Sequence, residues 1–353
     1  MKNILITGGA GFIGSNFCHY WAAQHPNDKL IVLDALTYAG HREHLALLEE
    51  NNALVFVQGD ICDQPLVEDL FARHAINCVV HFAAESHVDR SIDGPDAFIQ
   101  TNIMGTHVLL KAAKKFWLDA GLVDHHFHHV STDEVYGSLE ADAPAFTEST
   151  PFAPNSPYSA SKAASDHLVR AYHHTYGLKV TTSNCSNNYG PYQDSEKLIP
   201  LIIQNILLGK ALPIYGDGKN IRDWLYVEDH CRAIDLILAK GKIGEVYNVG
   251  GENEWRNIDI VNLICNQVDS ALAADAQLLQ QYPNTPYAKG DAAKNLITFV
   301  KDRPGHDRRY AIDPSKCHAQ LGYYPQESFE TGIVKTIQWM LHNQKKNTGG
   351  SSE

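Results

Sequence analysis

The sequence predicts an α/β fold in which a doubly wound parallel sheet is followed by a smaller C-terminal lobe. Short, near-continuous apolar runs alternate with amphipathic stretches over the first half of the chain. This alternation is typical of parallel strands that are buried on both faces and connected by helices. After about residue 190 the alternation gives way to turn-rich segments, among them NNYGPY, PIYGDGKN and VGGENEW. They indicate a second lobe built from excursions out of the last strands.

The expected strands follow the chain in order: KNILIT, KLIVLD, ALVFVQ, NCVVHF and HFHHVS, then KVTTSN and EVYNVG. The last of them, at about residues 245–250, is expected to return to the main sheet. We therefore expect a first domain over residues 1–190, a second lobe mainly over 191–340, and a polar tail over 341–353 without fixed structure.

Composition and charge exclude several functional classes. A hydrophobic content of 44% and 20% charged residues are ordinary for a globular protein. The formal charge of −12 argues against nucleic acid and against an anionic membrane as the main partner. Seven scattered cysteines without a Cys-x-x-Cys pair favour reduced thiols in a cytoplasmic protein. We find no signal peptide and no apolar run near the roughly 18 residues of a membrane span.

Three glycines, Gly8, Gly11 and Gly14, stand between the first expected strand and the first helix. Glycines let the chain turn sharply and let backbone N–H groups approach a pyrophosphate at a helix N-terminus. The second strand ends in Asp34, which can accept hydrogen bonds from an adenosine ribose and repels a 2′-phosphate. The pattern predicts a Rossmann-type dinucleotide site. It favours NAD over NADP, while Arg42 and His41 nearby leave NADP open.

Two further strand ends are expected to border the same cofactor. Asp60 follows the third strand, where it could meet the adenine or cap a helix, and the spacing does not decide between these. Ala83 and Ala84 follow the fourth strand and are small enough for the pyrophosphate and ribose to pass.

Two adjacent acids, Asp133 and Glu134, follow the fifth expected strand. Adjacent carboxylates repel each other, and the end of a buried strand is a costly place to keep them. One interpretation is a helix N-terminus, where the dipole favours acids. The other is a general acid paired with a general base.

Tyr158 and Lys162 lie four residues apart in PYSASKAASDHL and so face the same way on an expected helix. An ammonium group lowers the pKa of a neighbouring tyrosine, which can then act as a base toward a sugar hydroxyl. Such pairs are common by chance. Downstream of a dinucleotide motif and just after the acid pair, this one indicates hydride chemistry at a nicotinamide.

Four histidines, His125, His126, His128 and His129, raise the question of a metal site. No carboxylate or cysteine stands at ligand spacing from them, so we expect a structural role and no metal.

Long motifs carry a resemblance that covers the chain from the first strand to about residue 340. They are TGGAGFIG, DALTYAG, FAAESHVDRS, VSTDEVYG, YSASKAASD, SNNYGPYQ, EKLIP, YGDGKNIRDWLYVEDH and RPGHDRRYAID. Through them the sequence resembles the extended short-chain dehydrogenase/reductases and, among these, the nucleotide-sugar 4,6-dehydratases. The resemblance implies a lyase (a hydro-lyase) with tightly bound NAD that acts on a nucleotide sugar, with dTDP-glucose as the first expectation. It also implies a homodimer formed through helices that include the one bearing Tyr158.

The resemblance further implies a role for each catalytic candidate. Tyr158 would deprotonate the 4-hydroxyl as hydride moves from carbon 4 to NAD, with Thr132 bonded to the 4-oxygen and Lys162 to the nicotinamide ribose. Glu134 would remove the carbon 5 proton, and protonated Asp133 would give its proton to the departing 6-hydroxyl. Hydride then returns to carbon 6 and a proton to carbon 5, giving the 4-keto-6-deoxy sugar. Epimerase relatives have small or hydroxyl residues in place of the acids, so the resemblance favours the acid–base interpretation of the pair.

Further contacts are implied position by position. Additional cofactor contacts would be Phe12, Ile13, Ala35, Leu36, Thr37, Ile61, Phe82, Thr101 and Asn188. Substrate contacts would be Ser86, Thr132, Asn187, Lys197, Leu198, Pro213, Tyr215, Arg222, Asn257, Arg303 and His306. The cations among them suit a diphosphate, whereas without the resemblance Arg222 and Arg303 would be taken for solvated surface residues. Asp194 and Ser195 depart from the family pattern beside the nucleotide region, where apolar residues or proline are commoner.

Three alternatives stay open at the level of sequence. The chain could be a dehydratase for another nucleoside-diphosphate sugar. It could be a nucleotide-sugar 4-epimerase, which shares the cofactor, Tyr158 and Lys162 but differs at the acid pair. It could also be a cofactor-binding scaffold without turnover.

Overall fold

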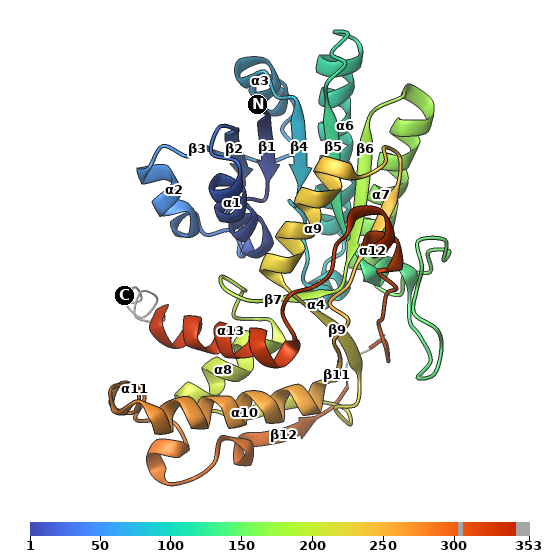
Figure 1. Cartoon of the computed structure of the whole chain (residues 1–353). Coiled ribbons are helices and arrows are strands. Elements are labelled where there is room, and N and C mark those ends of the chain that lie inside the picture. The colour runs from blue at the N-terminus through green and yellow to red at the C-terminus, as the bar shows by residue number, and fades with distance from the viewer. Residues whose placement is uncertain (303–305, 344–353) are drawn as a thin grey trace.

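A seven-stranded parallel sheet forms the centre of the computed structural model, which describes residues 1–302 and 306–343 (Figure 1). Its strand order is β10-β6-β5-β4-β1-β2-β3, and every neighbouring pair is parallel. The bounds are β1 (Asn3–Thr7), β2 (Lys29–Asp34), β3 (Leu54–Gln58), β4 (Cys78–His81), β5 (His126–Thr132), β6 (Val180–Cys185) and β10 (Val246–Val249). The predicted Rossmann-type sheet is confirmed.

One property of the predicted strands is wrong for β3. This strand lies at the edge of the sheet, and Val55 within it is 40% exposed. An edge strand has a neighbour on one side only, so part of its apolar run meets solvent. By contrast, β4 in the middle of the sheet is buried along its whole length.

Helices cover both faces of this sheet. One face packs against α3 (Gln64–His74), α6 (Thr106–Ala113) and α7 (Pro157–Tyr176). The other packs against α1 (Phe12–Gln24), α2 (Ala46–Glu50) and α9 (Val227–Lys240). Shorter elements complete this part: η1 (Arg42–Leu45), α4 (Val88–Asp93), α5 (Asp96–Phe98), η2 (Ile99–Gly105), η3 (Lys114–Leu118), η4 (Asp133–Tyr136) and α12 (Ser315–Leu321). The two layers cover the central strands on both faces and leave the strand ends for a site.

The later part of the chain adds two small sheets and a helical layer, seen below the main sheet in Figure 1. One sheet joins β7 (Asn187–Tyr189), β9 (Ile221–Tyr226) and β11 (Glu254–Arg256), and the other joins β8 (Leu212–Tyr215) and β12 (Ile297–Val300). The helices are α8 (Leu198–Leu208), α10 (Asn257–Ala274), α11 (Ala276–Gln281) and α13 (Phe329–Asn343), with the short turns η5 (Tyr287–Lys289) and η6 (Ala293–Leu296).

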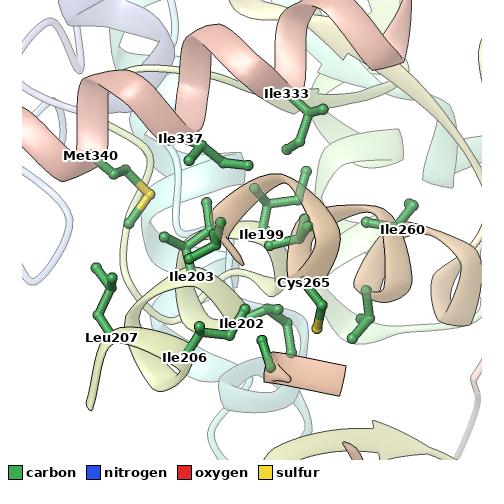
Figure 2. Packing of buried hydrophobic residues seen from close by; sticks show 14 of the residues in the cluster. Ile199, Ile202, Ile203, Ile206, Leu207, Ile260, Cys265, Ile333, Ile337 and Met340 are labelled. Carbon is green, nitrogen blue, oxygen red and sulfur yellow. The ribbon is translucent and has the colours of Figure 1, made fainter. Parts of the chain in front are cut away.

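A separate apolar core holds these helices together. Figure 2 shows Ile199 and Ile203 of α8 among Ile260 of α10 and Ile333 and Ile337 of α13. Each such side chain, fully buried, contributes about 1.5–3 kcal/mol. The proposed boundary near residue 190 stays a prediction, and β10 follows that residue in sequence yet lies in the main sheet.

In the part of the chain covered by residues 1–302 and 306–343, none of the helices has the length and apolar character that crossing a bilayer requires.

Candidate active site

A cavity of about 540 Å³ opens at the carboxyl ends of the parallel strands. Its walls include Gly8 after β1, Asp34 at the end of β2, Phe82 after β4, Thr132 at the end of β5 and Cys185 at the end of β6. The strand register aligns these ends, since Thr132 pairs with Cys185. Residues of the second lobe close the other side. This is the position at which open α/β sheets bind ligands.

The glycine turn between β1 and α1 forms one end of the cavity. Gly8 has a φ of +71°, and a Cβ there would lie 2.7 Å from the backbone nitrogen of Ala83. A Cβ on Gly14 would lie 2.2 Å from the Gly8 carbonyl oxygen. Gly11 precedes α1 without a side-chain cap, and the first turn of α1 contains no acid. The positive end of the helix is therefore available to an anion at the cavity wall.

Asp34 is buried at the end of β2 and is held by two backbone groups. Its Oδ2 accepts the N–H of Ala10 and its Oδ1 accepts the N–H of Leu36, both at 2.9 Å. Leu36, with a φ of +53°, contributes this N–H but does not line the cavity, whereas Ala35 and Thr37 do. Arg42 pairs with Glu49 at 2.9 Å and is absent from the wall. The charge next to the turn is thus negative, which suits an unphosphorylated ribose.

The other expected cofactor positions also line the cavity. They are Gly11, Phe12, Ile13, Gly14, Asp60, Ile61, Phe82, Ala83, Ala84, Thr101 and Asn188. Asp60 does not cap α3, because the cap is Asp63, whose side chain accepts the N–H of Leu66. Asp60 instead accepts the N–H of Cys62 at 2.8 Å.

The acid pair occupies the first turn of η4, directly after β5. Thr132, not an acid, is the cap of this turn: its Oγ1 accepts the N–H of Glu134 at 3.3 Å and donates to Oδ1 of Asp133 at 3.3 Å. The helix N-terminus interpretation therefore describes the backbone, but the capping is done by Thr132. Glu134 lines the cavity with Thr132, whereas Asp133 lies just behind the wall.

Asp133 is 1% exposed, and among the described residues its Oδ2 has no hydrogen-bond partner. Burial, reinforced by the charge of Glu134, raises the pKa of Asp133 well above its usual range. Burial of this kind keeps a carboxyl group protonated at neutral pH. The two adjacent acids therefore differ in environment: Asp133 is buried, and Glu134 is more accessible and lines the cavity.

Tyr158 and Lys162 come from the first turns of α7, which begins with a capping box at Ser156. Both side chains line the cavity. The expected lowering of the Tyr158 pKa is wrong here: burial, with Glu134 adding to it, raises that pKa well above its usual range. The Lys162 ammonium donates to the carbonyl oxygen of Val130 at 2.8 Å, and burial lowers the pKa of Lys162.

The expected substrate positions lie on the opposite wall. Those that line the cavity are Ser86, Asn187, Lys197, Leu198, Pro213, Tyr215, Arg222, Asn257 and His306. Arg222 is 6% exposed, donates to the carbonyl of Asp307 at 2.9 Å and stacks on the ring of Tyr310, so a solvated surface role is wrong for it. Arg303 lies outside the described residues.

Comparison with known proteins agrees with this geometry. A family described as GDP-mannose 4,6 dehydratase matches residues 5–336. The dTDP-glucose 4,6-dehydratase 1 of Escherichia coli strain K12 is 53% identical, over 97% of this chain and 93% of the relative. A Xanthomonas campestris dTDP-glucose 4,6-dehydratase is 54% identical, over 98% and 94%. The crystal structure of DesIV, the dTDP-glucose 4,6-dehydratase of Streptomyces venezuelae with NAD and TDP bound, superposes with a TM-score of 0.86 at 45% identity over 98% of both chains.

The chain belongs to the dTDP-glucose 4,6-dehydratase family.

The fold alone does not separate this dehydratase family from epimerases. The UDP-glucose 4-epimerase of Thermotoga maritima superposes with a TM-score of 0.80 at 28% identity, covering 96% of this chain and 98% of that one. A TM-score so close to that of the dehydratases means that the difference lies in side chains at the site. The resemblance predicts that the distinguishing side chains of this chain are those of Asp133 and Glu134.

Sequence reasoning missed several residues of the dehydratase cavity, including Tyr38, Glu85, His87, Gln193 and Tyr310. All five stand inside motifs quoted for the resemblance, but no spacing or charge pattern singles them out. Burial of Tyr310 beside Arg222 follows from folding the second lobe over the sheet, which a local pattern cannot reveal.

The four histidines of the dehydratase lie at and before β5 and have protein partners. His128 is buried between the hydroxyls of Thr181 and Ser183, at 2.9 and 3.1 Å, and His129 contacts Asp166 at 3.0 Å. His125 and His126 contact the Leu122 carbonyl and Thr181. Over residues 1–302 and 306–343, no group of three or more histidines, cysteines or acids could hold a metal ion. The contacts support structural roles.

Proposed function

We propose that this chain is an NAD-dependent lyase that converts dTDP-glucose into dTDP-4-keto-6-deoxyglucose. The observation that carries the proposal is the acid pair: a buried acid, Asp133, adjoins an accessible carboxylate, Glu134, beside Tyr158. A dehydration after oxidation at carbon 4 needs one group that donates a proton and one that accepts a proton. Two carboxyl groups in environments as different as those of Asp133 and Glu134 suit that need.

The glycine turn, Asp34 and the small residues after β4 fit NAD, because they leave room for a pyrophosphate and offer an acceptor to ribose hydroxyls. When bound, NAD accepts hydride from carbon 4 of the sugar and later returns it to carbon 6. In our proposal Lys162 holds the nicotinamide ribose, and Thr101 and Asn188 lie against the cofactor.

The residues of this chain move the protons. Tyr158 takes the proton of the 4-hydroxyl, and Thr132 donates a hydrogen bond to the 4-oxygen. The ketone formed at carbon 4 acidifies the proton on carbon 5, which Glu134 removes. Asp133 donates its proton as the carbon 6–oxygen bond breaks, so the 6-hydroxyl leaves as water. Glu134 then returns its proton to carbon 5 as hydride reaches carbon 6. The proton that Tyr158 took up is released and Asp133 takes up a proton again, which restores the starting state.

The cations on the second wall hold the diphosphate in this proposal. Arg222 presents a guanidinium that is buried and fixed by backbone carbonyls, and Lys197 donates to the Ser86 carbonyl at 3.1 Å. Positively charged donors that are already oriented bind phosphate oxygens with little further ordering. Asn187, Asn257 and His306 complete the sugar and phosphate contacts, while Leu198, Pro213 and Tyr215 border the base.

A panel of nucleoside-diphosphate glucoses tests the proposal. The purified protein, loaded with NAD, is incubated with the dTDP, UDP, GDP and CDP sugars, and products are separated and treated with alkali. We expect dTDP-glucose to give the 4-keto product, which absorbs in alkali, and Tyr158→Phe to give none. A carbon 4 epimer as the product would replace the proposal with the epimerase alternative. If only another sugar nucleotide of the panel were converted, that nucleotide would replace dTDP-glucose as the proposed substrate.

We propose further that the protein works as a homodimer through helices around α7. Three apolar side chains, Ile92 of α4 and Ile99 and Met104 of η2, are 43%, 50% and 44% exposed, and both elements pack against α7. Clustered apolar exposure of this kind marks protein interfaces. Light scattering should give a dimer mass for wild type and for Leu47→Glu on α2, and a monomer mass for the Ile99→Glu, Met104→Glu double variant. A monomeric wild type would contradict the proposal.

We infer that the protein acts in a reducing, cytoplasmic compartment. Its seven cysteines are all free, and six of them are buried. Such thiols are typical of proteins kept in reducing surroundings.

A further inference from the structure

A third polar side chain continues the row of Tyr158 and Lys162 along α7. Asp166 follows Lys162 by four residues, so the two side chains lie on the same face of the helix. Asp166 is 6% exposed and lies outside the cavity wall. A carboxyl group buried so deeply is costly unless its surroundings compensate it.

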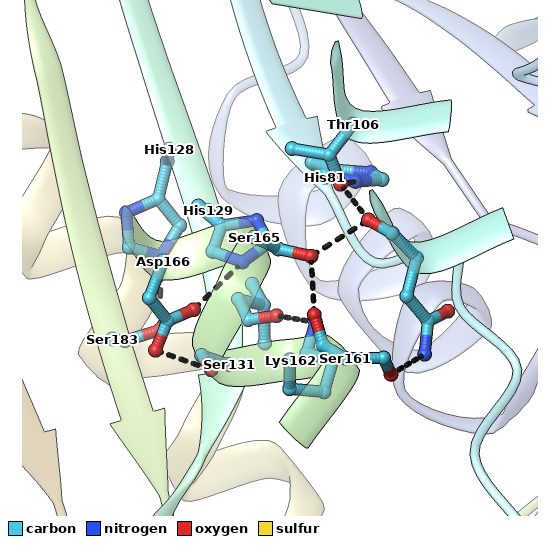
Figure 3. A network of polar contacts seen from close by, with 12 residues as sticks. His81, Thr106, His128, His129, Ser131, Ser161, Lys162, Ser165, Asp166 and Ser183 are labelled. Carbon is cyan, nitrogen blue, oxygen red and sulfur yellow. Dashed lines mark hydrogen bonds and ion pairs between the residues drawn. The ribbon is translucent and has the colours of Figure 1, made fainter. Parts of the chain in front are cut away.

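Asp166 is bonded to the strand that carries the acid pair. Its Oδ1 contacts Nε2 of His129 at 3.0 Å, and its Oδ2 accepts the hydroxyl of Ser131 at 2.9 Å. Between these two residues, the carbonyl of Val130 accepts the Lys162 ammonium at 2.8 Å. Figure 3 shows these contacts joining α7 to β5. Three consecutive residues of β5, ending next to Thr132, are therefore held by Lys162 and Asp166.

The charges around Lys162 identify Asp166 as its main counterion. Lys162 is 4% exposed, so its positive charge is nearly cut off from water. Asp166 is the group that most strongly raises the Lys162 pKa against the effect of burial, followed by Cys185 of β6. From the sheet, His81 of β4 and His129 of β5 also face the ammonium, and burial lowers the pKa of both well below the usual range.

These neighbours define the charge balance of the site. Two neutral imidazoles do not compensate the ammonium, so the carboxylate of Asp166 is its counterion among the described residues. Burial raises the Asp166 pKa to about 7, while Lys162, Ser131 and His167 act to lower it. Above that pH Asp166 is ionised. His129 then contributes a neutral N–H to Asp166, which fixes the carboxylate without cancelling its charge.

We propose that Asp166 is a positioning residue for the reaction: it keeps the buried Lys162 positively charged and holds α7 in register with β5. This inference rests on the proposed function, because it concerns the charge next to Tyr158. The phenol of Tyr158 is buried beside Glu134, which disfavours its ionised form. A retained ammonium one helical turn away opposes that effect. Asp166 thus acts on the first hydride transfer through Lys162, without touching the sugar.

Asp166→Asn is the direct test, because it keeps the size of the side chain and removes the charge. NADH formation in a single turnover of dTDP-glucose is measured from about pH 6 to about pH 10, where lysine and tyrosine titrate. Loss of the anion lowers the Lys162 pKa, so the alkaline limb of the rate profile should move to lower pH by about one unit or more. At a pH on the descending alkaline limb of the wild type, the variant should therefore form NADH about tenfold more slowly. The KM for dTDP-glucose should stay near wild type.

Two further variants separate positioning from stability. Asp166→Glu restores the charge and should return the alkaline limb toward the wild-type position. Ser183→Ala is the matched control: Ser183 is also buried, and its hydroxyl bonds His128 of β5 at 3.1 Å. It should lower the melting temperature without moving the limb. A merely structural Asp166 would give the same result as Ser183.

Each outcome decides the inference. A wild-type alkaline limb in folded Asp166→Asn overturns it. If Asp166→Asn does not fold, His129→Asn, which removes the donor to Asp166, should move the limb in the same direction by a smaller amount. In that case an unmoved limb in folded His129→Asn overturns it. Failure of the wild-type protein to form NADH from dTDP-glucose would instead reject the proposed function.

Discussion

Asp34 is the residue whose position was most fully foreseen from spacing, and its contacts explain why it can meet a ribose. Both carboxylate oxygens are oriented by backbone N–H groups, so little ordering remains when a ligand binds. The positions of the glycines and of the residues at the later strand ends could also be predicted from the sequence. The surroundings of Asp133 and Arg222 could not, because they depend on burial. A sequence does not reveal that, among the described residues, one oxygen of Asp133 has no partner or that Arg222 is fixed by the carbonyl of the distant Asp307.

Replacing Asp34 by alanine should weaken NAD binding. The substitution removes a charged acceptor for ribose hydroxyls, and such hydrogen bonds contribute about 1.5–3 kcal/mol, so the dissociation constant should rise by about tenfold or more. Calorimetric titration of NAD measures it. Asp63→Ala is the control, since Asp63 caps α3 and lies outside the cavity. Equal NAD affinity in Asp34→Ala and wild type would place the ribose elsewhere.

Glu134→Gln should stop the reaction after the first hydride transfer. Glutamine keeps the size of the side chain but cannot take the proton from carbon 5. A single turnover should therefore build up NADH absorbance that decays slowly, with kcat lower by about 10²–10⁴-fold. Tyr158→Phe should suppress the NADH signal itself. Incorporation of solvent deuterium at carbon 5 at the wild-type rate in Glu134→Gln would mean that another group is the base.

Among the elements, those with a strong local pattern were predicted well and those defined by packing were not. β2 has the bounds of its apolar run, and α7 begins at the residue after its capping serine. Exposure of β3 at the sheet edge escaped prediction, since an apolar run does not reveal how many neighbours a strand will have. The lowered pKa expected for Tyr158 failed for a related reason: helical spacing places Lys162 near it, but it does not reveal that burial, with Glu134 adding to it, raises the pKa of Tyr158.

The turn between β1 and α1 should not tolerate a side chain at Gly14. A Cβ there would lie 2.2 Å from the Gly8 carbonyl oxygen, so Gly14→Ala must push the turn away from the helix. We expect a loss of about 1–3 kcal/mol in the free energy of unfolding, as for other overpacked sites, together with weaker NAD binding. Thermal melting with and without NAD measures both. Gly94→Ala, whose Cβ would meet its nearest neighbour at 3.9 Å, should behave as wild type.

At the scale of the whole molecule, the sheet class follows from the sequence, whereas the closure of the cavity does not. The cavity walls come from the ends of six strands of the main sheet and from segments after residue 185, brought together by the core of α8, α10 and α13. These contacts join residues far apart in the chain, and no local pattern encodes them. The residues of the substrate wall were predicted from the family resemblance, because spacing alone does not identify them.

The same fold buries imidazoles that have no role in the proposed chemistry, and this makes stability depend on pH. His128 is fully buried between Thr181 and Ser183. Burial, followed by neighbouring histidines, lowers its pKa well below the usual value of 6.5. The unfolded chain therefore binds a proton below about pH 6.5 that the folded protein does not accept. The buried neutral imidazole of His128 therefore imposes no cost on the folded state above that pH, and the protein loses stability as the pH falls below it. Asp133 and Asp166, whose pKa values are raised, act in the opposite direction.

His128→Gln isolates one such contribution, because the variant keeps Asp133, Asp166 and the other buried histidines. A single histidine that stays neutral in the folded state costs about 1.4 kcal/mol of stability on going from about pH 7.5 to about pH 5.5. Between about pH 7.5 and about pH 5.5, the free energy of unfolding of the wild type should therefore fall by about 1.4 kcal/mol more than that of the variant. Urea denaturation at both pH values measures this difference. His342→Gln, at the exposed end of α13, should keep the wild-type difference. If His128→Gln kept it too, His128 would take up its proton in the folded protein, and a buried neutral imidazole would be the wrong description of that site.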